Sequence, residues 1–338
     1  MVAINPTMVE ARYYRRNGDD FICELCPKSC TLRDGQTGAC GARRVENWML
    51  VATTYGKVSC IASDPIEKKP LFNFRPRSRI FSIGSIGCNM SCRFCQNYAL
   101  SQSFSGNKRT TYKSPEEIVA MCRKDGTDLF AFTYNESAIW YEYIMDVISF
   151  APDLTYVMVS NGLIKEAPLK DLCSVVDAFN IDIKGFNKDF YTHICGAQLD
   201  DVLKSLRIIH ESDAHLELTY LVIPEYNDDM DEIAELSAWI KDNLSCDVPL
   251  HFTRFHPDNE MMDVPWTPVQ TLIKARETAL DAGLNYVYIG NVMTEDGNDT
   301  ICPYCGSTVI KRTGYLVEII GLDEDRCSNC GKKLSIIR

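Results

Sequence analysis

The sequence predicts an α/β fold: a partial (β/α)6 barrel of the TIM-like kind, with a cysteine-rich segment before it and a small cysteine ribbon after it. Two observations carry this prediction. Short apolar runs alternate with amphipathic segments through the middle of the chain, as in βα units that build a parallel sheet. Cysteines with the spacing of metal ligands gather near both ends. We therefore expect three parts, at residues 1–75, 76–295 and 296–338.

Composition limits the class of protein. The 338 residues are 46% hydrophobic, which is enough for a large core, and the net charge of -11 argues against nucleic acid or an anionic membrane as a partner. An apolar run of about 18 residues is missing, as is a signal-peptide apolar region, so we expect a cytoplasmic protein away from membranes. In that compartment sixteen cysteines indicate metal ligands rather than disulfides.

The first cysteine group lies on loops rich in Pro and Gly, where a bound metal would hold the chain together. Its four all-thiolate ligands suit either structural zinc or an auxiliary iron-sulfur cluster, and the sequence does not separate the two. After it, residues 48–61 are rich in β-branched and aromatic side chains and predict a hairpin that turns at Gly56. The group comprises Cys23, Cys26, Cys30 and Cys40.

The second group has the spacing Cys88-x3-Cys92-x2-Cys95 and follows an apolar run. Three thiolates on one tight loop can hold three irons of a 4Fe-4S cluster and leave the fourth iron without a protein ligand. An incomplete zinc site fits less well, because a structural zinc takes four ligands and no fourth lies nearby. An open iron is a place to bind and reduce a small molecule.

The barrel elements follow in order. A helix after Ser114 has both its start and its stop signals. Ser114 is the N-cap, Glu117 follows three residues later, and Gly126 ends the helix. Further helices lie in between, including a long helical region at residues 187–212. Strands are expected at residues 129–135, 155–161, 178–185, 215–224, 249–257 and 285–292.

Polar residues stand where these strands end, and in such barrels chemistry gathers at the carboxyl ends of the strands. Carboxylates and amides can receive an ammonium group or hydroxyls, and a lysine can pair with a carboxylate. The residues are Asn135, Glu136, Ser160, Asn161, Asp182, Lys184 and His256.

The tail carries two C-x2-C knuckles, each followed by glycine. Two tight turns of this kind close a tetrahedral four-sulfur site, and the β-like residues between them fit the hairpin of a zinc ribbon. Zinc or a rubredoxin-like iron is expected there. The ligands are Cys302, Cys305, Cys327 and Cys330.

The cysteine spacing, with aromatic Phe94 just before Cys95, resembles the signature of radical S-adenosylmethionine (radical SAM) enzymes. Its wider context, DPIEKKPLFNF before and CQNYALSQ after, is similar to radical SAM enzymes of the AmmeMemoRadiSam system, relatives of the pyruvate formate-lyase activating enzyme. The resemblance implies that the open iron chelates S-adenosylmethionine (SAM), that Glu67, Lys68 and Lys69 lie near the rim of the site, and that flavodoxin or ferredoxin donates electrons. It also implies that Phe94 packs near the adenine of SAM, that Asn135 and Glu136 bind the methionine amino end, and that Ser160 and Asn161 hold the ribose. The lysine of the Asp182-x-Lys184 element is expected near the methionine carboxylate, and His256 is expected near SAM.

The predicted activity is reductive cleavage of SAM to methionine and a 5'-deoxyadenosyl radical, which abstracts hydrogen from a substrate that the sequence does not identify. Lys184 and Cys195 are the candidate catalytic residues, although a buried structural thiol is an open alternative for Cys195. One alternative function is activation of a glycyl-radical enzyme, a protein substrate. Another is a non-catalytic iron-sulfur and zinc scaffold for electron transfer, which would not bind SAM.

Overall fold

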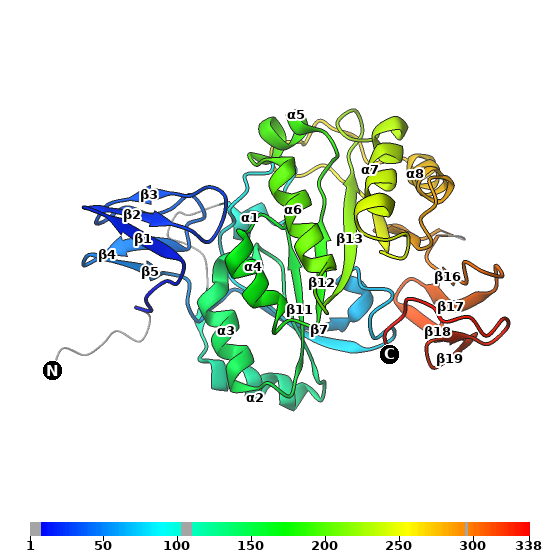
Figure 1. Cartoon of the computed structure of the whole chain (residues 1–338), viewed down its shortest axis with the longest axis horizontal. Coiled ribbons are helices and arrows are strands. Elements are labelled where there is room, and N and C mark those ends of the chain that lie inside the picture. Colours follow the sequence, from blue (N-terminus) through cyan, green and yellow to red (C-terminus); the bar gives the residue numbers. More distant parts are fainter. Residues whose placement is uncertain (1–7, 103–109, 295–296) are drawn as a thin grey trace.

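The computed structural model describes residues 8–102, 110–294 and 297–338, and therefore not the expected boundary at residues 295 and 296. A twisted sheet with its helices forms the middle of the molecule. The strands of residues 14–52 project from one end, and the ribbon formed by residues 300–327 lies toward the other (Figure 1). In the described ranges, the helices fall short of the length and apolar character needed to cross a bilayer.

The central sheet has eight strands in the order β15-β14-β13-β12-β11-β10-β8-β7. All neighbouring pairs from β8 to β15 are parallel, and β7 adds to β8 in the antiparallel sense. The sheet stays open, with β7 and β15 at its edges. The predicted α/β fold is thus confirmed. The strands are β7 (Cys60–Pro65), β8 (Arg79–Gly84), β10 (Leu129–Phe132), β11 (Thr155–Ser160), β12 (Ala178–Asp182), β13 (His215–Val222), β14 (Leu250–Arg254) and β15 (Val287–Gly290).

Helices connect the parallel strands and bury their apolar faces against the sheet. The helix after Ser114 has the predicted ends. The Ser114 side chain accepts from the Glu117 N–H, and the Glu117 side chain accepts from the Ser114 N–H. Gly126 ends the helix with a left-handed φ of 81°. The helices are α1 (Tyr98–Ser101), α2 (Pro115–Asp125), α3 (Tyr141–Phe150), α4 (Glu166–Cys173), α5 (Lys188–Phe190), α6 (Leu199–His210), α7 (Met230–Asn243) and α8 (Val269–Asp281).

One predicted element is wrong, and a second is helical with one interruption. The hairpin across Gly56 is replaced by three strands with separate partners: β5 (Met49–Ala52) pairs with β4 (Arg43–Glu46), β6 (Lys57–Val58) with β9 (Thr111–Tyr112), and β7 with β8. The helical region 187–212 is broken after a π-helical turn, Tyr191–Cys195, where Gly196 has a φ of 66°.

The N-terminal module, residues 10–52, contains a three-stranded sheet of β1 (Tyr14–Asn17), β2 (Asp20–Cys23) and β3 (Thr31–Leu32) beside the β4 and β5 pair. A buried ion pair between Arg43 and Glu142 of α3 joins this module to the barrel. Because breaking such a pair leaves an uncompensated buried charge, it fixes the position of the module on the barrel.

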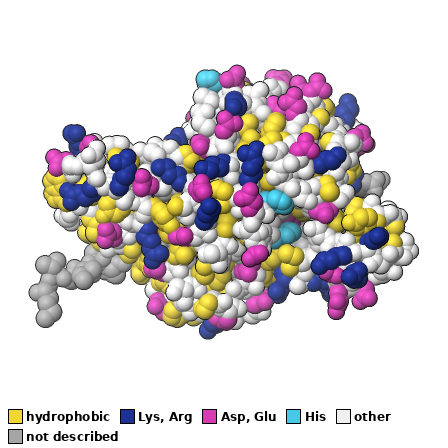
Figure 2. Space-filling view, viewed as in Figure 1, with side chains coloured by type: hydrophobic (Ala, Val, Ile, Leu, Met, Phe, Trp, Pro, Cys, Tyr) yellow, Lys and Arg dark blue, Asp and Glu magenta, His cyan; other side chains and the backbone are white. Residues whose placement is uncertain are grey.

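The C-terminal ribbon has its own small core around Val309, Ile310 and Val317. Its predicted hairpin is present, with β17 and β18 antiparallel. Acidic and basic side chains are interspersed over the face shown in Figure 2, the ribbon included. The ribbon strands are β16 (Thr300–Ile301), β17 (Thr308–Thr313), β18 (Leu316–Ile319), β19 (Leu322–Asp323) and β20 (Arg326–Cys327).

Candidate functional site

A cavity of about 330 Å³ opens at the carboxyl ends of the parallel strands. This volume is within the range of small-molecule sites. The three cysteines of the loop after β8 line it together with polar residues from the ends of neighbouring strands, so the chain brings its second cysteine group and its strand-end residues to one place. The sequence-predicted residues that line it are Cys88, Cys92, Phe94, Cys95, Asn135, Glu136, Ser160, Asn161, Asp182 and Lys184.

The cysteine loop is held in shape by Asn135. Its Oδ1 accepts from Ser85 N–H at 2.8 Å, and its Nδ2 donates to the Gly87 carbonyl at 3.0 Å. Gly87 has a φ of 95°, and a Cβ there would lie 2.4 Å from the Cys40 carbonyl oxygen. Asn135 therefore uses both polar atoms of its side chain to position the loop.

The three thiols are suited to a metal cluster. Burial raises the pKa of Cys88 and Cys95, and contact with the Cys195 thiol, followed by burial, raises that of Cys92. Such thiols stay protonated at neutral pH unless a metal replaces the proton. All three line the same cavity and come from one loop, so the donor set fits three irons of a 4Fe-4S cluster.

Glu136 is buried on the wall of the cavity. Its Oε1 accepts from Ser160 Oγ at 2.6 Å and its Oε2 from the Asn161 backbone N–H at 2.7 Å. Burial raises the pKa of Glu136, and these hydrogen bonds oppose that rise. The Asn161 side chain in turn approaches Cys88 Sγ at 3.5 Å. Ser160 and Asn161 thus hold a carboxylate beside the cysteine loop.

Lys184 supplies a positive charge to the same cavity. Its Nζ lies 2.8 Å from Asp182 Oδ2. Burial lowers the pKa of Lys184, but the charge of the Asp182 carboxylate outweighs burial and leaves that pKa raised. The lysine therefore remains an ammonium that can pair with a carboxylate ligand.

The remaining sequence-predicted residues have different positions. Phe94 lines the cavity and stacks on Phe190 with ring centroids 5.9 Å apart. Cys195 is completely buried, and its backbone carbonyl accepts from the Ser91 N–H of the cysteine loop at 2.9 Å. His256 lies outside the cavity, with its ring 5.3 Å from that of Trp266. The SAM and catalytic roles of these residues stay predictions.

Lys69, expected near the rim of the site, lines the cavity, as does Tyr134, to which the sequence analysis gave no role. Lys69 is 3% exposed and pairs with Asp64 at 3.0 Å, and Tyr134, with a φ of 75°, donates its hydroxyl to the same carboxylate at 3.1 Å. A positive φ in a tyrosine is rare and marks a constrained site. Lys68 also lines the cavity, whereas Glu67 turns away toward Arg312 of the ribbon. The DPIEKKP pattern was the one sequence signal for this side.

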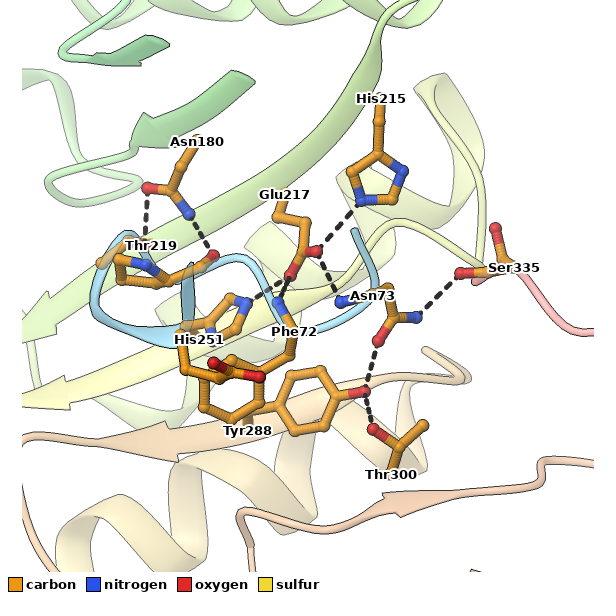
Figure 3. Close-up of polar contacts among 12 residues, drawn as sticks. Phe72, Asn73, Asn180, His215, Glu217, Thr219, His251, Tyr288, Thr300 and Ser335 are labelled. Atoms are coloured by element: carbon orange, nitrogen blue, oxygen red, sulfur yellow. Dashed lines mark hydrogen bonds and ion pairs between the residues drawn. The ribbon is translucent and has the colours of Figure 1, made fainter. Parts of the chain in front are cut away.

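Below the cavity, the chain closes the barrel with residues 70–75. Both oxygens of Glu217, on β13, accept a backbone N–H from this segment, from Asn73 at 2.7 Å and Phe72 at 3.0 Å. Each oxygen also meets a histidine, His215 at 3.0 Å and His251 at 2.6 Å (Figure 3). Burial alone would raise the pKa of Glu217, but the histidines lower it to about 2. The ionised carboxylate therefore joins residues 70–75, which form the floor of the barrel, to the sheet.

The C-terminal cysteines form a compact site. The Cys302 and Cys330 sulfurs are 3.7 Å apart, as are those of Cys305 and Cys327. With zinc–sulfur bonds of about 2.3 Å, a regular tetrahedron has edges of about 3.8 Å. All four sulfurs lie within 4.8 Å of one another. The ribbon can therefore bind one metal ion with four thiolates.

Residues 82–237 match the family model described as the Radical SAM superfamily. A protein of Methanocaldococcus jannaschii, described as uncharacterized, is 41% identical over 335 residues, covering 98% of this chain and 100% of the relative.

Two of the solved structures that match part of this chain are as follows. A domain of the pyruvate-formate lyase-activating enzyme from Bacteroides vulgatus is 17% identical with a TM-score of 0.39, covering 45% of this chain and 91% of that chain. A radical SAM methyltransferase from Sphaerobacter thermophilus is 14% identical with a TM-score of 0.49, covering 62% of this chain and 66% of that chain.

Proposed function

The chain belongs to the radical SAM superfamily, and on that basis we propose that it cleaves SAM reductively and uses the resulting radical to abstract hydrogen from a peptide or protein substrate. The observation that carries the proposal is the convergence of three cysteines, a buried carboxylate and a buried ammonium on one cavity. A 4Fe-4S cluster held by Cys88, Cys92 and Cys95 would supply one electron to the sulfonium of SAM, giving methionine and a 5'-deoxyadenosyl radical.

The protein's own residues orient the methionine part of SAM. The Lys184 ammonium is available for the carboxylate of SAM, and Glu136 for its amino group. Glu136 Oε2 accepts one hydrogen bond from the protein, from Asn161 N–H, and a carboxylate oxygen can accept two. Because one negative and one positive group line the same cavity, they favour one orientation of the amino acid end of SAM.

The apolar wall of the cavity limits access by water. Phe94, Val159 and Leu221 line it, and Phe94 is 3% exposed because Phe190 covers it. Such a wall suits the adenine ring and strengthens the charge contacts by lowering the local dielectric constant.

The large apolar side chains near the mouth support a macromolecular substrate. Trp266 is 55% exposed, Met262 68% and Met293 80%. They lie on the segments that follow β14 and β15, and the cavity opens at the same carboxyl ends of the strands. Exposed apolar groups on this side of the molecule are a feature of protein contact sites. A glycyl-radical activase is one function of this kind, and membership of the AmmeMemoRadiSam group stays a prediction.

The test is anaerobic reconstitution with iron and sulfide, followed by dithionite and SAM, with 5'-deoxyadenosine measured by mass spectrometry. The wild-type chain should form it, and Cys92→Ala should not, although its ribbon metal and circular dichroism are retained. If the wild-type chain, with its iron and sulfide loaded, forms none, the enzymatic proposal is wrong and a non-catalytic scaffold is favoured.

A further inference from the structure

A second charged cluster lines the cavity, built by the turn that follows β7. Lys68 and Lys69 lie at the end of this turn, and both side chains reach back to the strand. Lys68 Nζ lies 3.0 Å from Asp64 Oδ1, and Lys69 Nζ lies 3.0 Å from Asp64 Oδ2. The next residue, Pro70, is fixed because its carbonyl accepts from Asn180 Nδ2 at 2.7 Å. One carboxylate is therefore shared by two lysines that both line the cavity.

The charges of this cluster do not balance. Two ammonium groups face one carboxylate, which leaves one positive charge beside the cavity. The Asp64 carboxylate stays ionised: burial alone would raise its pKa, but the hydrogen bonds from Lys68 and Lys69 lower it. Glu67, the next carboxylate along the chain, pairs with Arg312 instead. A ligand with a single negative charge would therefore neutralise the cluster.

Lys69 is the buried member of the cluster. It is 3% exposed, and its Nζ lies 4.8 Å from the centre of the Tyr134 ring. An ammonium has three N–H donors and the Asp64 oxygen accepts from one, so Lys69 can also donate to a ligand. Burial lowers the pKa of Lys69, and the hydrogen bond to Asp64 opposes this lowering. A second anion would stabilise the buried ammonium in the same way as Asp64.

An uncharged donor on the cavity wall points to the same kind of ligand. The amide Nε2 of Gln96 is buried and has no hydrogen-bond partner in the part of the chain that the structure describes. Buried polar atoms are normally paired, so an unpaired donor in a cavity marks the place of a ligand acceptor. A carboxylate supplies two acceptor oxygens and one negative charge. A phosphate monoester carries about 1.5 to 2 negative charges and would exceed the charge of the cluster.

We propose that Lys69, with Lys68 beside it, binds a carboxylate of the substrate, and that the enzyme therefore acts on a peptide which presents an acidic group to the cavity. The inference rests on the proposed function, which makes the second ligand a substrate. Lys69 donates to the carboxylate, Lys68 adds charge from a side chain that is 41% exposed, and Gln96 donates to the same ligand. The carboxylate of SAM pairs with Lys184, so the cavity binds two anions together.

The subsite is tested with trifluoroacetate, a single carboxylate whose fluorine resonance broadens on binding. The full chain is loaded with its cluster and SAM but receives no reductant, so SAM stays intact. Lys69→Met should bind trifluoroacetate about tenfold more weakly than the wild-type chain, because a hydrogen bond between charged groups is lost. Lys68→Met, at a partly exposed position, should weaken binding about threefold. Lys124→Met, at an exposed position on α2, is the matched control and should leave the affinity unchanged.

Equal affinities in the wild-type chain, Lys69→Met and Lys68→Met would overturn the subsite. Tighter binding of monofluorophosphate than of trifluoroacetate would overturn the carboxylate class. A loss of SAM affinity in Lys69→Met, with the circular dichroism of the wild-type chain, would show that Lys69 binds SAM itself and would also overturn the inference. Trifluoroacetate binding that depends on Lys69, in a chain that forms no 5'-deoxyadenosine once reduced, would instead refute the proposed function and leave the subsite.

Two capped amino acids identify the source of the carboxylate. N-acetylglutamic acid α-amide carries it on the side chain, and N-acetylalanine carries it at the C-terminus. The compound that displaces trifluoroacetate at the lower concentration gives the position of the carboxylate in the peptide. The neutral N-acetylglutamine α-amide should displace none. Displacement by neither acid, or equal displacement by the neutral amide, would overturn the assignment to an acidic peptide.

Discussion

Replacing Glu217 with glutamine should lower the free energy of unfolding by about 3 kcal/mol at neutral pH. The pKa of this carboxyl falls from its ordinary 4.5 to about 2 in the folded chain, and each pH unit of such a difference corresponds to about 1.4 kcal/mol. The structure gives a second route to a similar value. Each oxygen meets one backbone N–H and one histidine. A glutamine NH2 must therefore face a backbone donor, and a buried unsatisfied donor costs about 1–3 kcal/mol.

The same contacts fix the sign of the pH dependence. Because the folded-state pKa of Glu217 is lowered, its contribution to stability is fully present above pH 4.5 and is lost as pH falls from there toward about 2. The difference in stability between the wild-type chain and Glu217→Gln should therefore narrow as pH falls from 4.5 toward about 2.

Thermal unfolding under nitrogen, followed by circular dichroism, measures the effect. A loss of 3 kcal/mol corresponds to a fall in Tm of roughly 6 °C or more, given about 2–4 °C per kcal/mol for domains of 150–250 residues. Hydrogen exchange should also show faster exchange at Phe72 and Asn73. Glu235→Gln, on the exposed face of α7, is the control. An unchanged Tm in Glu217→Gln at pH 7 would show that the floor does not depend on this charge.

Three further outcomes are expected. Cys305→Ser should remove about one metal ion per chain by elemental analysis while Cys246→Ser removes none; an unchanged content in Cys305→Ser would contradict the ribbon site. Arg312→Ala should destabilise the docked ribbon by about 3–5 kcal/mol, because it leaves the buried carboxylate of Glu67 unpaired. Proteolysis of the ribbon should therefore be faster in this variant. Equal proteolysis in Arg312→Ala and in Lys311→Ala, a substitution of the exposed neighbour, would argue against this role of Arg312. Ser114→Ala should cost about 1 kcal/mol in urea unfolding by removing the cap of α2, and no loss would mean that the capping box adds little.

Features with local causes could be predicted from the sequence. The ends of α2 follow from Ser114, Glu117 and Gly126, all within thirteen residues, because capping is decided by neighbours along the chain. The ribbon hairpin and the alternation of strands and helices are similar cases, since their patterns repeat over short distances.

Features that depend on distant partners were mispredicted or missed. The hairpin across Gly56 failed because β6 pairs with residues 111–112 and β7 with β8, and a local pattern does not specify such partners. The floor network was missed for the same reason. Glu217 stands within an alternating strand pattern, and only the fold places Phe72 and His251 beside it.

The candidate site lies between these cases. The cysteine spacing indicated a cluster because three ligands come from one loop. The side chain of Asn135 was expected at the ligand, whereas the structure shows both of its polar atoms engaged with the cysteine loop. Residue type and strand end were sufficient to place it, but the direction of its hydrogen bonds depends on a neighbouring loop fifty residues away.

The bonds of Asn73 imply an order in time for the assembly of the protein. Its side-chain amide donates to the Ser335 carbonyl at 2.9 Å, and its carbonyl accepts from Ile337 N–H at 2.8 Å. A ribosome adds about 5–20 residues each second, and domains generally fold as units during synthesis. These two bonds must wait until residue 337 has been translated, more than ten seconds after Asn73 at the faster rate. Until residue 337 has been made, the segment around Asn73 lacks both of these contacts with the tail.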